Sequence, residues 1–142
     1  MPVARPDGRY RRGMSHQIEV IATPGAPPAI GPYSQAVRAG DFVFVSGQVA
    51  VDVRTGKLAE GIAAQTGQVL ENLRAVLAAA GASLDQVVKV TIFLARWEDF
   101  AAMNEVYAGY FTARPPARSV IQGPRIPEGT LVGLEAVAYL GR

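Results

Sequence analysis

Two segments of the chain repeat their apolar residues at helical spacing, and both lie among segments that favour β-strands. Over 59–80 the apolar residues recur every three or four positions, and Gly81 supplies a C-terminal stop. Over 97–111 the same spacing recurs, and the predicted buried side carries Trp97, Phe100, Met103, Tyr107 and Phe111. Each amphipathic helix has to bury its stripe, so the chain needs a sheet against which both can pack.

The remaining apolar segments alternate or cluster in the way that strands do. They are 17–22, 34–39, 42–47, 86–95, 117–122 and 131–140. Gly40 and Asp41 separate the second and third of them, which is typical of a two-residue hairpin, and Gly56 marks another turn within 52–58. Four prolines make 23–33 a loop.

The order of these elements is β-β-β-α-β-α-β-β, which predicts an α+β fold of two layers. We expect a mixed six-stranded sheet with both helices on one face. The other face of that sheet is apolar enough to need cover, and a large exposed apolar patch is rare on a monomer. The sequence therefore indicates self-association.

The length of 142 residues leaves room for one domain, which we place at 17–142, after a basic extension at 1–16 that is predicted to be flexible. The net charge is +2, but residues 1–13 contribute +3, so the rest of the chain stands at −1. A domain that binds nucleic acid normally concentrates Lys and Arg on the fold itself, so this distribution disfavours nucleic acid as a partner. No stretch has the apolar length of a secretory signal or a membrane span, and a cytoplasmic protein with no membrane partner is expected.

Cysteine is absent and histidine occurs once, as His16. These counts exclude disulfides, thiolate chemistry and cysteine zinc sites, and any His-based metal centre or catalytic triad would have to use His16. The glycines match neither a P-loop nor a dinucleotide fingerprint. Neither a metal nor a cofactor is expected.

Two charged residues stand out in apolar surroundings. Arg118 follows two prolines and an alanine at the start of an apolar strand, so its guanidinium is either paired structurally or free for an anion. Its rigid fork of donors suits a carboxylate. Glu135 lies among apolar residues in the last strand, where a carboxylate needs a partner if it is buried. A structural partner and a ligand contact both stay open for Glu135.

Six segments together form a recognisable set of motifs. They are IGPYSQAV (30–37), VFVSGQVAVD (43–52), the long stretch 63–94, DFAAMNEVYAGYF (99–111), PPARSVI (115–121) and LVGLEAVAYL (131–140). In this order they resemble the Rid family of reactive-intermediate deaminases, also known as YjgF-like proteins and, under an older name, as endoribonuclease L-PSP. The resemblance implies a chorismate-mutase-like fold and a homotrimer whose sheets form a central barrel, with three small-molecule clefts between subunits. It also implies hydrolysis of 2-imino or 2-enamino acids to 2-keto acids and ammonia without a cofactor.

The family's motifs assign candidate site residues by resemblance. Arg118 of PPARS would hold the substrate carboxylate, and Tyr33 of IGPY would line the pocket and close over the ligand. Asn104 of MNEVY and Ser46 of VSGQ would supply polar wall contacts, and Gly31 would let a carboxylate approach the backbone. Three of these residues have a structural alternative: a loop anchor for Tyr33, a turn residue for Ser46 and a partner for a backbone group for Asn104.

Two positions depart from the RidA-type pattern. Val120 stands where a cysteine is usual, but the contact there is attributed largely to the backbone carbonyl, which Val120 retains. Gly133 stands where a glutamate usually positions the attacking water, and Glu135, on the same face, lies about 6.6 to 7 Å further along. Loss of a positioned base costs about 10² to 10⁴ in rate, so reduced activity is expected. We also expect Gly133 to open space beside Arg118 for a larger substrate.

Three functions compete at this point. The first is hydrolysis of a small or medium 2-imino acid, with Arg118 as anchor. Gly133 motivates the second, a non-catalytic trimer that binds carboxylate metabolites in the same clefts. The third, RNA cleavage or translation inhibition, comes only from the older family name, and the slightly acidic balance beyond residue 13 and the lack of a second histidine argue against it.

Overall fold

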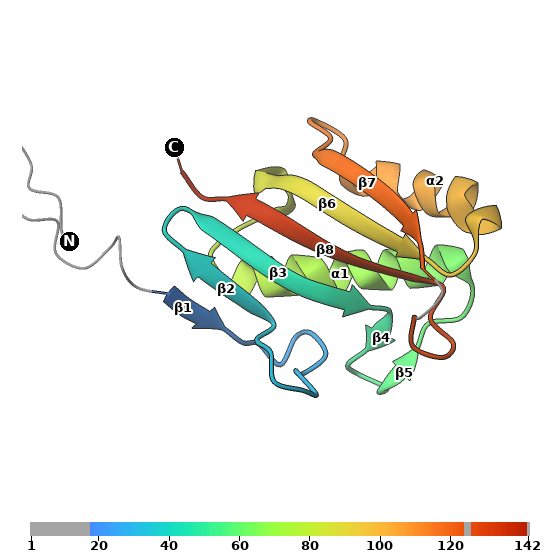
Figure 1. The fold of residues 1–142 in the computed structure, drawn as a ribbon, viewed down its shortest axis with the longest axis horizontal. Helices are drawn as coiled ribbons and strands as arrows, with labels where there is room; N and C mark the ends of the chain where they lie inside the picture. The colour runs from blue at the N-terminus through green and yellow to red at the C-terminus, as the bar shows by residue number, and fades with distance from the viewer. Residues whose placement is uncertain (1–17, 124–125, 142) are drawn as a thin grey trace, which may run out of the picture.

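The computed structural model of the chain describes residues 18–123 and 126–141. The extension predicted at 1–16 lies outside the described residues. Within them, a six-stranded sheet carries both α-helices on one face, and a separate two-stranded hairpin follows the third strand (Figure 1). The prediction of an α+β fold with a mixed six-stranded sheet is confirmed.

The strands of the main sheet lie side by side in the order β1-β2-β3-β8-β6-β7. They are β1 (Ile18–Ile21), β2 (Ala36–Ala39), β3 (Phe42–Val49), β6 (Val87–Leu94), β7 (Ala117–Gln122) and β8 (Val132–Tyr139). Neighbouring strands are antiparallel except for β6 and β7, which are parallel because the chain crosses over between them. β1 and β7 are therefore the two edges of this sheet.

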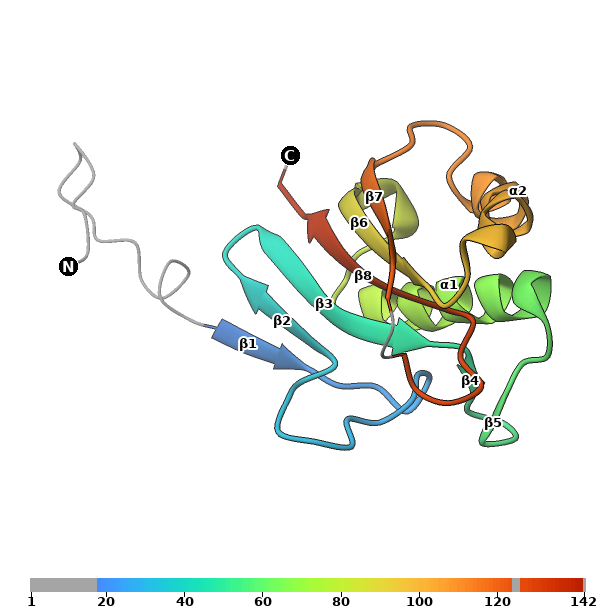
Figure 2. The ribbon, with the colours of Figure 1, turned by 45° about the vertical axis from the view of Figure 1, so that its right-hand side comes forward.

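The helices α1 (Ile62–Ala79) and α2 (Phe100–Tyr110) pack against each other on the same side of the sheet (Figure 2). Short 3-10 turns precede β6 and α2, at η1 (Leu84–Gln86) and η2 (Trp97–Asp99). The core lies between the helices and the sheet, where α1 buries Val69, Leu70, Leu73, Val76 and Leu77. These residues have the helical spacing that the sequence predicts, because one stripe of α1 faces the sheet.

The predicted turns are present, and two details of the strands go beyond the prediction. Gly40, Gly56 and Gly81 all have positive φ, at 60, 71 and 76°, as a tight hairpin, a turn and a helix stop require. Around the Gly56 turn the chain forms a small hairpin of β4 (Val51–Asp52) and β5 (Lys57–Leu58), which is too short to show a strand period in the sequence. The pairing of β3 with β8 also shifts register between Val45 and Gln48, which marks a bulge.

The face of the sheet opposite the helices is apolar and exposed in the single chain. Its exposed large side chains include Ile18, Val20, Phe42, Phe44, Ile121 and Tyr139. The ring of Phe42 contacts the rings of Phe44 and Tyr139, with centroids 6.4 and 5.2 Å apart, so part of this face is a continuous aromatic surface. This face, called the open face below, is the one for which the sequence predicts cover.

Candidate functional site

Arg118 lies in the edge strand β7 and points to the helix side of the sheet, since its parallel partner Val90 is fully buried there. Its guanidinium carbon lies 4.8 Å from the centre of the Tyr107 ring and 5.8 Å from that of Phe100. One terminal nitrogen donates to Oδ1 of Asn104 at 2.7 Å. No carboxylate pairs with Arg118 within residues 18–123 and 126–141, so its remaining donors can meet an anion.

Asn104 is brought next to Arg118, as a shared site requires. Its side-chain oxygen holds the guanidinium, and its amide N–H makes no hydrogen bond to another residue of the described part of the chain. The structural alternative for Asn104 was a hydrogen bond to a backbone group, and the structure shows the bond to Arg118 instead. Val120, two residues after Arg118 on the same side of β7, packs against the core, and the ligand contact of its carbonyl stays a prediction.

Tyr107 lies beneath Arg118. Its side chain is 5% exposed, and its hydroxyl has no hydrogen-bond partner among the residues that the structure describes. Burial raises the pKa of Tyr107, and the positive charge of Arg118 opposes that shift. The ring is therefore neutral near pH 7 and presents its π face to the cation. The sequence predicts Tyr107 only as a core residue, although its spacing of three from Asn104 indicates a common helix face.

Tyr33 and Gly31 lie in the proline-rich loop before β2. Tyr33 is 49% exposed, and a Cβ added at Gly31 would lie 3.5 Å from its ring, so the ring covers Gly31. The hydroxyl of Tyr33 accepts a long hydrogen bond of 3.3 Å from the N–H of Ile30, which leaves its own proton free for a ligand. Gly31 does not have positive φ, and its predicted role in admitting a carboxylate stays a prediction.

The buried side chain of Gln35 fastens this loop. Its Oε1 accepts from the N–H of Thr23 at 2.6 Å, and its Nε2 lies 2.8 Å from the carbonyl oxygen of Pro27, with those of Thr23 and Ala26 at 3.1 and 3.2 Å. Gln35 is not among the site residues that the sequence predicts. Its place directly after the IGPYS motif was the available signal, because a glutamine at the start of a strand can pair with the loop that precedes it.

Ser46 lies in the bulge of β3 and is tied to the same loop. Its hydroxyl donates to the carbonyl oxygen of Ser34 at 2.5 Å, and its N–H donates to the carbonyl of Gln35 at 2.9 Å. Because a hydroxyl has one proton, Ser46 can only accept a hydrogen bond from a ligand. Ser46 is therefore tied to the loop that carries Tyr33, and the pocket roles of both residues stay predictions.

Gly133 lies in β8, between Val49 of β3 and Phe93 of β6, on the open face of the sheet. A Cβ added there would lie 3.1 Å from the carbonyl oxygen of Gln48, closer than most real Cβ contacts. Arg118 is two strands away and on the opposite face. Gly133 therefore opens no space beside Arg118 of the same chain, and its role in a cleft between two chains stays a prediction.

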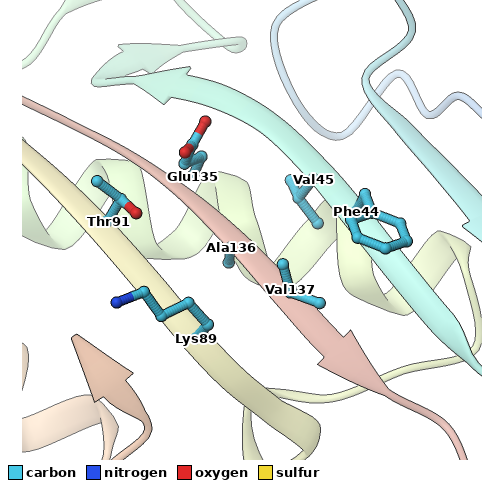
Figure 3. Close-up of a pocket in the computed structure, with 7 residues that line it drawn as sticks. All are labelled: Phe44, Val45, Lys89, Thr91, Glu135, Ala136 and Val137. Atoms are coloured by element: carbon cyan, nitrogen blue, oxygen red, sulfur yellow. The ribbon is translucent and has the colours of Figure 1, made fainter. Parts of the chain in front are cut away.

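Glu135 borders a shallow hollow of about 190 Å³ on the open face (Figure 3). The hollow is lined by Phe44, Val45, Lys89, Thr91, Glu135, Ala136 and Val137. Glu135 is exposed and pairs across the strands with Thr91, while the ammonium of Lys89 donates to Ser119. No other described residue makes a hydrogen bond to the Glu135 carboxylate, so the structural partner that was one alternative for it is not found in the described part of the chain.

Six of the eight predicted site residues fall into two groups that lie apart in one chain, and the other two, Gly133 and Glu135, lie in β8 on the open face. The arginine group, on the helix side of β7, contains Arg118, Asn104 and Val120. The tyrosine group, at the start of β2 and the bulge of β3, contains Gly31, Tyr33 and Ser46. Three strand spacings separate β7 from β3 and four separate it from β2, which is roughly 14 to 19 Å. A small carboxylate cannot touch both groups of the same chain.

A metal centre is not apparent at either group. Within residues 18–123 and 126–141, no three His, Cys, Asp or Glu side chains come together in a way that could hold a metal ion. Neither α-helix of the described part combines the length and apolarity that crossing a membrane requires.

The chain is similar to known proteins over most of its length. Residues 23–140 match the family model described as Endoribonuclease L-PSP. A RutC family protein of Pyrococcus horikoshii is 52% identical over 122 residues, which cover 85% of this chain and 97% of that protein. A 2-iminobutanoate/2-iminopropanoate deaminase of Salmonella typhimurium is 44% identical over 123 residues, with 84% and 96% covered.

A solved structure shows the same fold. The crystal structure of E. coli TdcF with bound serine matches with a TM-score of 0.84 at 40% identity, over 87% of this chain and 99% of that one. The resemblance inferred from the six motifs is thereby confirmed. The chain belongs to the endoribonuclease L-PSP family, whose members include the Rid, YjgF and RutC proteins.

Proposed function

We propose that the chain hydrolyses 2-imino or 2-enamino acids to 2-keto acids and ammonia, without a cofactor, in clefts between copies of itself. The observation that carries the proposal is Arg118, a guanidinium fixed by Asn104 and two aromatic rings, with no carboxylate partner in the described residues. The identity of 44% to an iminobutanoate and iminopropanoate deaminase supports this substrate class.

For this reaction the protein has mainly to bind the imino acid and to orient it toward water. The oxygen of water adds to C2 of the imine while the nitrogen gains a proton, and the resulting amino alcohol loses ammonia as the C–N bond breaks and the C=O bond forms. Arg118 would hold the carboxylate bonded to C2, and its positive charge would favour attack at that carbon. Tyr33 can donate and Ser46 can accept a hydrogen bond at the reacting atoms. Gly133 offers no carboxylate to the water, and for that reason we expect a moderate rate.

A complete site would need two chains. The arginine group and the tyrosine group are roughly 14 to 19 Å apart in one chain, so a cleft that contains both would take one group from each of two copies. The exposed apolar open face supplies a surface through which copies would associate. We propose a homotrimer with three such clefts, in agreement with the family resemblance. Its mass in solution would be close to three times the chain's 15.0 kDa.

The direct test generates 2-imino acids of increasing size with an amino-acid oxidase and follows their decay. We expect the protein to accelerate decay and Arg118→Ala to abolish the acceleration. Arg74→Ala is the matched control, because Arg74 also lies over a tyrosine ring, that of Tyr110 at 5.1 Å, but is paired with Glu71 on the outer surface of α1. No acceleration for any imine would overturn the proposed activity.

Mixed assemblies test whether the site is shared. Arg118→Ala and Tyr33→Ala chains would each be impaired alone, but unfolding and refolding them together would restore roughly one quarter of the clefts, since each intact group then meets an intact partner group by chance. If both groups of a cleft came from the same chain, mixing would restore nothing. That outcome would contradict the shared cleft while leaving the activity itself standing.

Two other candidate functions can be distinguished from this one by experiment. The non-catalytic carboxylate binder is favoured by Gly133, and binding of 2-keto acids with no effect on any imine would select it. The family's description names an endoribonuclease, but residues 14–142 have a net charge of −1. RNA binding that weakens with salt and survives removal of residues 1–13 would support this third function. The cytoplasmic location stays a prediction from the sequence.

A further inference from the structure

Trp97 is the most exposed residue of the stripe that the sequence predicts over 97–111. The sequence predicts Trp97 on the buried side, together with Phe100 and Tyr107, but the structure leaves 50% of it exposed. It lies in the 3-10 turn η2, just before α2, so its ring extends beyond the part of the stripe that the core covers. Tryptophan is enriched at binding surfaces, because its ring is apolar while its N–H can still meet a polar partner.

The exposed ring continues a row of aromatic side chains that leads to Arg118. Trp97 stacks on Phe100, with centroids 4.9 Å apart and an interplanar angle of 23°. Phe100 in turn lies 5.8 Å from the guanidinium carbon of Arg118. The Trp97 ring is therefore at most about 11 Å from that carbon, within reach of a ligand that has a carboxylate at one end and a ring at the other.

We infer that Trp97 and Phe100 form a subsite for a large apolar or aromatic side chain of the ligand whose carboxylate Arg118 holds. The inference rests on the proposed function for the place of the carboxylate, and it adds the substrate class: 2-imino acids with an aromatic or bulky apolar side chain. Phe100 is partly buried and fixed against the core, and it holds the indole of Trp97 in position. A ligand ring would pack against the exposed part of Trp97 beside Phe100, and because Phe100 already holds the indole, little conformational freedom would be lost on binding.

Stacking of this kind predicts a preference that depends on the ligand's side chain. An aromatic pair contributes roughly three- to tenfold in affinity beyond the contact of the carboxylate. A ligand with only a methyl side chain reaches Arg118 but not Trp97. A substitution of Trp97 should therefore weaken binding of the larger ligand more than that of the smaller one. A substitution of Arg118 should weaken binding of both ligands alike.

Trp97 is the only tryptophan of the chain, so its fluorescence reports directly on this surface. The probes are lactate and 3-phenyllactate, unreactive hydroxy acids that differ in one phenyl ring. We expect phenyllactate to change the fluorescence in a saturable way and lactate to change it little, and we expect Arg118→Ala to remove the response. Equal responses to both probes, or a phenyllactate response that persists in Arg118→Ala, would overturn the subsite.

Calorimetry then measures affinity in variants without the fluorophore. Trp97→Ala should weaken phenyllactate roughly three- to tenfold and lactate less than twofold, and Trp97→Phe should recover most of the loss. Glu98→Ala, at the next exposed position of the same turn, is the matched control and should leave both unchanged. A loss of equal size for both probes would indicate a merely structural role for Trp97 and contradict the inference.

The binding experiments separate this inference from the proposed activity. If no imine is hydrolysed but phenyllactate still binds through Trp97 and Arg118, the activity is wrong and the subsite stands. If small and aromatic imines are hydrolysed equally well, by the wild type and by Trp97→Ala alike, the activity stands and the subsite is wrong.

Discussion

Removing the side chain of Gln35 should release the loop that carries Tyr33. The amide of Gln35 accepts one hydrogen bond and faces three carbonyl oxygens, but its nitrogen has two protons, so about three bonds form at once. At about 0.5 to 1.5 kcal/mol each, these bonds are together worth roughly 2 to 4 kcal/mol. Most of the loop is exposed and its backbone groups can return to water, so we expect Gln35→Ala to lower the free energy of unfolding by about 2 kcal/mol.

Urea unfolding followed by the fluorescence of Trp97 measures the global loss, and hydrogen exchange measures the local one. We expect faster exchange of the amides in 23–33 and a raised KM, because Tyr33 leaves its place. Gln68→Ala is the control: its amide makes one side-chain bond, to Asn72 at 2.9 Å, and the expected loss is about 1 kcal/mol without faster exchange in the loop. A loss below about 1 kcal/mol for Gln35→Ala, with unchanged exchange in 23–33, would refute the reasoning.

Two further outcomes follow from the packing. Gly133→Ala places a Cβ 3.1 Å from the carbonyl oxygen of Gln48, and this crowding should lower the free energy of unfolding by about 1 to 3 kcal/mol. The less flexible unfolded chain of the variant offsets about 0.4 to 1 kcal/mol of that loss. A variant more stable in urea than the wild type would contradict this prediction. Burial raises the pKa of Tyr107 in the folded protein above its ordinary 10.0. The contribution of Tyr107 to the free energy of unfolding is therefore fully present below pH 10, and it is lost as the pH rises from 10 through the higher pKa of the folded state. Tyr107→Phe should make that alkaline loss shallower, and identical pH curves for the two proteins would show that Tyr107 does not titrate in this way.

The regular elements could be predicted because their signals are local. The α1 stripe, the strand alternation of β6 and the glycines at 40, 56 and 81 each act over a few residues, and the structure places them where the sequence indicates. The bulge of β3 and the hairpin of β4 and β5 were missed, since both are shorter than any period. The first turn of the second helical segment is 3-10, and this change leaves Trp97 exposed against expectation.

The site was harder to predict than the fold. Motifs named Arg118 and Asn104, and the structure shows their contact. They could not show that Tyr33 lies near the far side of the sheet, because strand order is a long-range property that no short segment carries. For the same reason the motifs could not show that Gly133 and Arg118 lie on opposite faces of one chain, so space between them stays a prediction for a cleft between two chains.

The separation of the two groups across the width of the sheet would tie the proposed activity to protein concentration. In the proposed trimer a cleft exists only while two chains are in contact, so dilution below the concentration at which the trimer dissociates would lower the activity per chain without unfolding any chain. Substitutions at Phe44 or Tyr139 on the open face, far from Arg118, would then resemble active-site defects in a dilute assay and recover in a concentrated one. In a cell, the amount of protein made would set how many working sites each chain has.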